Sequence, residues 1–219
     1  MNLFKSLKAF FTAPQPDSVA TSAHNRFSAA SDVFDAAFTA MEATTDDIDT
    51  YDGVIAGYTG IADFETYTDA YLDAHTSAID NLTAAFDDLT ATFTKCSRTD
   101  PLYKSAAAVY KATTALYVIA TDAYFRAAHR VTTTALEGSL QAAKDDFEVM
   151  LLETKAANTS ASDAPSANAK AAAFKDNAAR GAAAAKRLEQ KAAEALSKAE
   201  AFCAKASSAV AYAEKALAS

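Results

Sequence analysis

The chain has 219 residues, of which 57 are alanine, 5 glycine and 4 proline, and its formal net charge is −8. Valine and isoleucine together number only 13, which leaves too few β-branched residues for a β-sandwich, a barrel or a doubly wound sheet. With 51% hydrophobic residues the chain is too apolar for wholesale disorder. No stretch approaches the roughly 18 uninterrupted apolar residues of a spanning helix. We therefore expect a soluble all-α protein.

The first element is a short amphipathic helix at residues 2–12, which ends before Pro14 and Pro16. Its large apolar side chains share one helical face, and polar residues lie opposite or at its edges. The residues expected to bind a membrane or a partner are Leu3, Phe4, Lys5, Leu7, Lys8, Phe10 and Phe11. Such a helix predicts insertion at a lipid interface with its lysines toward anionic headgroups. Docking into a groove on another subunit or partner is the alternative.

The same lysines interrupt the apolar run too early for a secretory signal peptide. A mitochondrial-type presequence fits the segment better, although the first arginine is Arg26. We expect a cytoplasmic protein that is peripheral to a membrane or particle surface and has no transmembrane helix.

Prolines and glycines divide the remainder into four long helices. Gly53, Gly57 and Gly60 predict a turn or kink near 57–62, and Asp100-Pro101 predicts a capped helix start. The expected helices are 17–57, 62–96, 101–157 and 167–217. The corresponding organisation is an N-terminal helix and proline hinge at 1–16, a long-helix bundle at 17–157, a linker at 158–168 and an alanine-rich helix at 169–219.

A seven-residue apolar repeat runs through these helices and predicts an elongated antiparallel helical bundle or coiled coil. Its main members are Phe27, Phe34, Met41, Ile48 and Ile55, then Leu72, Ile79, Phe86 and Phe93, then Tyr103, Tyr110, Tyr117 and Tyr124. The tyrosines are expected to pack in a core or interface rather than to stack on bases. After Ala135 the repeat shifts to Leu136, Leu140, Ala143, Phe147 and Leu151, and we expect the packed stripe to rotate with it.

The last helix places alanine at six successive heptad positions. These are Ala178, Ala185, Ala192, Ala199, Ala206 and Ala213. Alanine allows close helix approach but buries little area, so the helix needs several neighbours or a repeated assembly. We expect this seam to serve homo-oligomer assembly.

Charge is divided unevenly, because residues 1–100 hold 5 basic and 16 acidic residues whereas 101–219 hold 15 and 12. Opposite-signed halves suit antiparallel packing within a chain, or contacts between subunits. Nucleic acid is an unlikely partner, since its phosphates require a dense cationic surface.

Residues that carry chemistry are sparse and scattered. His24, His75 and His129 lie on three different expected helices without the spacing of metal ligands. Cys96 and Cys203 form neither a zinc motif nor a disulfide framework, and the acidic run at 46–53 fails as a calcium loop. The sequence predicts no catalytic residue, metal or cofactor, and thus no enzyme.

In architecture, an amphipathic N-terminal helix before long coiled-coil helices resembles N-BAR domains and the PspA group of membrane-remodelling proteins. The alanine-rich, tryptophan-free helices resemble phasins, which coat polyester granules. The likeness covers architecture and composition, and no functional residue is carried over. We expect a self-assembling structural protein that binds a membrane or other apolar surface through residues 2–12. The alternative is a virion or particle component whose N-terminal and alanine-rich helices dock into neighbouring subunits without lipid.

Overall fold

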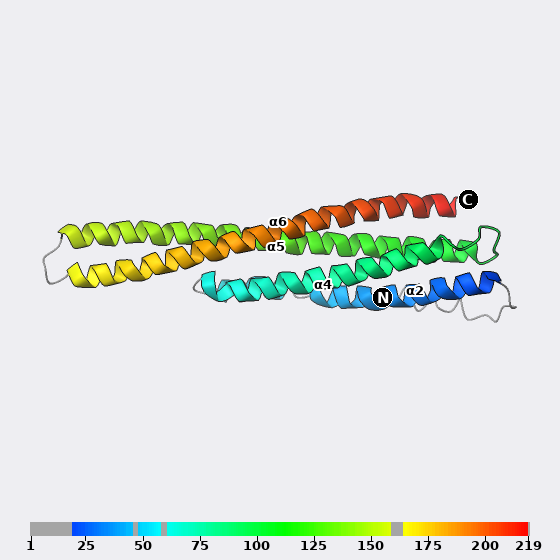
Figure 1. The fold of residues 1–219 in the computed structure, drawn as a ribbon, viewed down its shortest axis with the longest axis horizontal. Coiled ribbons are helices and arrows are strands. Elements are labelled where there is room, and N and C mark those ends of the chain that lie inside the picture. The colour runs from blue at the N-terminus through cyan, green and yellow to red at the C-terminus, as the bar shows by residue number, and fades with distance from the viewer. Residues whose placement is uncertain (1–18, 46–47, 58–60, 159–163, 219) are drawn as a thin grey trace. The chain divides into compact units, whose positions relative to one another are not determined.

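The computed structural model describes residues 19–45, 48–57, 61–158 and 164–218, and this part of the chain is helical apart from the turn between α4 and α5 and the C-terminal Ala218. Its helices are α2 (Val19–Thr45), α3 (Ile48–Gly57), α4 (Ile61–Phe93), α5 (Tyr103–Asn158) and α6 (Ala164–Leu217). Figure 1 shows α4 lying alongside α5, against which it packs. The predicted all-α helical bundle is confirmed.

Two of the predicted helix boundaries agree with the structure. The break expected near 57–62 separates α3 from α4. The Asp100 carboxylate accepts a hydrogen bond of 2.9 Å from the backbone N–H of Leu102, so the expected cap precedes α5.

Two boundaries differ from the sequence analysis. The helix expected at 17–57 is two helices, α2 and α3. At the end of α2 the Thr44 hydroxyl donates to the backbone carbonyl of Met41 at 2.8 Å, a local hydrogen bond that competes with the helical pattern. Helix α6 begins at Ala164, inside the expected linker at 158–168. Pro165 is tolerated there because the first turn of a helix leaves its N–H groups unbonded.

The chain divides into two compact units, and α4, α5 and α6 each contribute to both. Of the described residues, unit 1 comprises 19–45, 75–124 and 199–218, and unit 2 comprises 48–57, 61–74, 125–158 and 164–198.

An aromatic core fills unit 1. Phe27 and Phe34 of α2 face Phe93 and Phe86 of α4, with ring centroids 5.6 and 5.9 Å apart. Phe27 pairs with Phe93 and the later Phe34 pairs with the earlier Phe86, so α2 and α4 run antiparallel. The same Phe86 ring also stacks on Tyr117 of α5, with the ring centroids 4.3 Å apart. The rings are almost completely buried, as the heptad repeat predicts.

In the part of unit 2 where α5 packs along the alanine-rich α6, most of the buried side chains are small. Buried α5 residues include Gly138, Ala142 and Val149, and buried α6 residues include Ala171 and Ala178. These positions are four or seven residues apart, which is the spacing of one face of a helix packed along a seam. Small side chains on both sides allow the helices to approach closely.

Candidate functional site

The predicted binding segment at residues 2–12 lies outside the described residues. Its binding positions, Leu3, Phe4, Lys5, Leu7, Lys8, Phe10 and Phe11, therefore remain a prediction from the sequence.

The six alanines of the predicted assembly seam are buried within a single chain. Ala178, Ala185 and Ala192 lie in unit 2, and Ala199, Ala206 and Ala213 lie in unit 1. None is more than 2% exposed. The close approach that alanine permits is thus used by the chain's own helices. A role for this seam between copies remains a prediction.

The tyrosine ladder of α5 is tied to threonines of α4 in unit 1. The hydroxyls of Tyr110, Tyr117 and Tyr124 each lie 3.0 to 3.1 Å from a threonine hydroxyl. Their partners are Thr90, Thr83 and Thr76, in that order. Successive tyrosines are seven residues later on α5, and their threonine partners are seven residues earlier on α4. The two helices are therefore antiparallel, and the heptad repeats of both stay aligned along this contact.

These hydrogen bonds give the tyrosines a structural role. Tyr110 and Tyr117 are completely buried, and burial raises the pKa of Tyr117 to about 12. A buried hydroxyl without a partner costs free energy, and the threonines avoid that cost. The ladder therefore belongs to the core, as the sequence predicts, and its rings are not exposed for base stacking.

A second buried polar cluster lies in unit 2. The Tyr51 hydroxyl donates to the Thr134 hydroxyl at 2.9 Å and lies 3.1 Å from that of Thr68. Nearby on the surface, Arg130 donates to the Asp52 carboxylate. These contacts join α3, α4 and α5, and they were not found from the sequence because the partners are far apart in it.

Acidic residues of α4 pair with basic residues of α6 in both units. Arg187 donates two hydrogen bonds, of 2.5 and 2.7 Å, to Glu65 in unit 2, and Lys205 donates to Asp87 in unit 1 at 2.7 Å. The hydrogen bond from Arg187 lowers the pKa of Glu65. Within unit 2, Lys191 pairs with Asp69 just as Arg187 pairs with Glu65, so residue numbers increase together along the two helices and α4 and α6 are parallel there. Part of the opposite charge of the two halves of the chain thus forms ion pairs inside the chain. These pairs join two parallel helices, α4 and α6, each of which is antiparallel to α5.

The histidines do not form a metal site. In the described ranges no group of three His, Cys, Asp or Glu side chains could hold a metal ion. His24 and His75 are buried in unit 1, and burial lowers the pKa of His24.

Large apolar side chains are exposed in a row along α5 in unit 2. We call Leu136, Leu140, Phe147, Met150 and Leu151 the α5 row, and they are 61%, 58%, 56%, 58% and 49% exposed. The sequence analysis expected the packed stripe to rotate onto these positions, and this was wrong. The α5 residues that pack instead are the small ones, because the alanine face of α6 leaves room for close approach only where its partner is also small.

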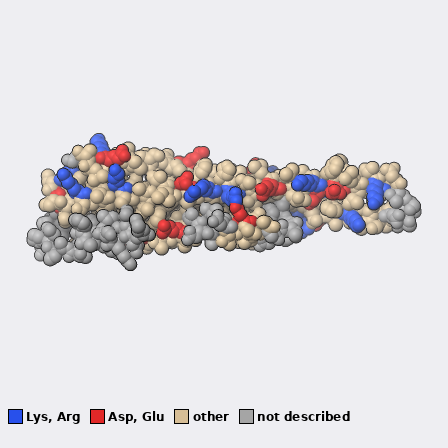
Figure 2. Space-filling view, turned by 180° about the vertical axis from the view of Figure 1, so that it is seen from behind, with Lys and Arg blue, Asp and Glu red and all other residues tan. Residues whose placement is uncertain are grey.

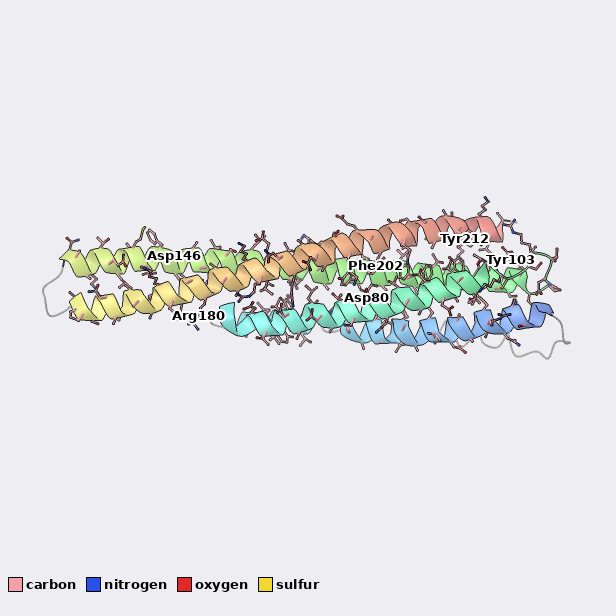
Figure 3. All side chains as sticks on the ribbon, in the orientation of Figure 1. Asp80, Tyr103, Asp146, Arg180, Phe202 and Tyr212 are labelled. Atoms are coloured by element: carbon pink, nitrogen blue, oxygen red, sulfur yellow. The ribbon has the colours of Figure 1, made fainter. Side chains whose placement is uncertain are left out.

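Beside the α5 row is a groove of about 600 Å³ between α5 and α6. Leu140 and Phe147 line it from α5 and Phe174 from α6, with Lys144 and Glu148 among its polar residues. The row and the groove share Leu140 and Phe147. Of the charged residues labelled in Figure 3, Asp146 on α5 and Arg180 on α6 belong to the helix pair that holds the groove.

Comparison with known proteins gives no relative: no family model, curated protein or solved structure matches the chain. Among the helices that the structure describes, none is long and apolar enough to cross a membrane.

Proposed function

We propose that this protein is a non-enzymatic, self-associating helical scaffold that binds a membrane or other apolar surface through residues 2–12. Membrane binding rests on the amphipathic pattern of residues 2–12, and the observation that carries self-association is the contrast between interior and surface. Buried tyrosine hydroxyls of both units are used in structural hydrogen bonds, whereas large apolar side chains of α5 face solvent. Contiguous exposed apolar surface is typical of proteins whose task is to bind another surface.

The charges outside the core support a scaffold rather than a nucleic-acid-binding protein. Figure 2 shows basic and acidic side chains interspersed on the described surface of one face. Several of the basic side chains, including Arg187, Lys191 and Lys205, are paired with carboxylates of α4. These residues therefore do not form the dense cationic patch that phosphate binding requires.

The alternative, a particle component without lipid, requires the alanine seam of α6 to dock into neighbouring copies. That seam is covered by the chain's own atoms, so no specific observation favours this alternative.

Co-sedimentation with vesicles of neutral and anionic phospholipid tests the proposal. The full chain should pellet with the vesicles, and a chain that starts at Asp17 should not. Phe4→Asp with Phe10→Asp should abolish binding, because charged residues would replace the apolar face. Asn2→Asp with Ser6→Asp is the matched control, since it adds the same charge outside the apolar face and should retain most of the binding. A full chain that stays in the supernatant at every lipid concentration would contradict membrane binding.

A further inference from the structure

The α5 row lies on the helix face away from the buried α5 positions, and Leu140 and Phe147 also line the open groove toward Phe174 of α6. Leu140 precedes the buried Ala142 by two residues, and Phe147 precedes the buried Val149 by two. Two residues correspond to about 200° around an α-helix. In this stretch α5 is thus apolar on two opposite faces, and only one of them is covered by the chain itself.

The spacing of the exposed face is that of a helix-pairing seam. Leu136, Leu140, Ala143, Phe147 and Met150 succeed one another by four, three, four and three residues. This is the spacing by which a helix presents a continuous stripe to another helix over several turns. The stripe predicts a long helix as its occupant.

We infer that the α5 row is covered by the α5 row of a second copy of this chain, with the two α5 helices antiparallel. The inference rests on the self-association in the proposed function and names the surface that performs it.

Charge complementarity supports this occupant and its direction. When Leu136 faces Phe147 of the second copy, Leu140 faces Ala143 of the second copy. The flanking positions then bring Glu137 of each copy opposite Lys144 of the other. The two-fold symmetry of such a dimer makes this opposite-charge pair occur twice.

The charges near the row disfavour an anionic membrane as the occupant. Residues 136–158 hold five acidic and two basic residues, so negative headgroups would be repelled rather than attracted.

The area available fits a weak dimer. With about 100 Å² exposed on each of the five side chains, the two copies would bury on the order of 1,000 Å², the lower limit for a specific interface. The groove beside the row adds apolar surface from Phe174. We therefore expect an association that depends on protein concentration.

Sedimentation velocity of the full chain over a wide concentration range tests the inference. The wild type should shift from monomer to dimer as concentration rises. Leu140→Asp should weaken the dimer by about tenfold or more, because it buries a charge in the seam. Ile119→Asp is the control, since Ile119 is also on α5 and 56% exposed but lies in unit 1. It should leave the dimer unchanged. Thermal unfolding of each variant checks that the fold is retained.

A charge exchange tests the antiparallel pairing. Glu137→Lys and Lys144→Glu should each weaken the dimer by placing like charges opposite one another, and the two together should restore it. Failure of the double variant to restore the dimer would overturn the pairing.

The outcomes also separate this inference from the proposed function. A wild-type dimer that persists unchanged in Leu140→Asp overturns the inference alone. A wild type that stays monomeric at all concentrations overturns it together with the self-association in the proposed function. If Leu140→Asp instead removes vesicle binding from a monomeric protein, the row faces lipid and the inference is wrong.

Discussion

Replacing Thr83 by valine should test whether the tyrosine ladder stabilises unit 1 through its hydrogen bonds. Valine keeps the shape of threonine but cannot bond to the Tyr117 hydroxyl, which lies 3.0 Å away. Tyr117 is completely buried, so its hydroxyl would lose the threonine without gaining water. Leaving a buried hydroxyl unsatisfied costs about 1–3 kcal/mol. For a chain of this length, the melting temperature should fall by about 2–4 °C for each kcal/mol.

The companion change, Tyr117→Phe, should cost less. This change removes the hydroxyl of Tyr117, which is the more deeply buried of the two partners. The remaining Thr83 hydroxyl can turn toward a backbone carbonyl of α4. The expected loss is about 0.5–1.5 kcal/mol. The double variant replaces both partners by apolar groups of similar shape. It should therefore be more stable than Thr83→Val alone, which is the signature of direct coupling.

Urea unfolding followed by circular dichroism measures these differences. Thr92→Val is the matched control, because Thr92 is also on α4 and its hydroxyl bonds only to carbonyls of its own helix. It should change stability by no more than about 0.5 kcal/mol. If Thr83→Val is as stable as the wild type, or if the two single losses simply add in the double variant, the hydrogen bond between Thr83 and Tyr117 does not stabilise the bundle.

Three further perturbations probe other parts of the core. Ala192→Leu should lower the melting temperature, because Ala192 is completely buried and overpacking costs about 1–3 kcal/mol; the exposed neighbour Ala193→Leu should be nearly neutral, and equal melting of the two would contradict the packed seam. Phe93→Ala should cost about 3–5 kcal/mol in urea unfolding, since it empties a site that is 1% exposed. Burial lowers the pKa of His24 below its ordinary 6.5, partly opposed by Asp100, so the folded state takes up protons less readily than the unfolded state. Stability should fall as pH drops below 6.5 toward that lower value, and His24→Gln should flatten this slope in melting experiments; an unchanged slope would exclude His24 as its cause.

Several features of the fold could be predicted from local sequence. Helix formation follows from alanine content and the scarcity of β-branched residues. The start of α5 follows from Asp100-Pro101, because a capping carboxylate and a proline act on neighbouring backbone groups. The burial of Phe27, Phe93 and Tyr117 follows from heptad spacing, since large apolar side chains at that period share one helix face.

The identity of the partners could not be predicted in the same way. A heptad repeat states that a helix has an apolar face but does not state which helix covers it. The pairing of Tyr117 with Thr83, and the parallel alignment that joins Glu65 to Arg187, depend on the register between helices far apart in the sequence.

The α5 row shows most clearly the difference between what local sequence predicts and what packing between helices decides. From the sequence alone, the stripe through Leu140 and Phe147 is the more apolar face of this part of α5. The structure instead packs Ala142 and Val149 against α6. The sequence determined that this segment is helical and apolar on two faces. The tertiary structure decided which face is buried, because the alanines of α6 gain most contact when the opposing side chains are small enough for the helices to approach closely.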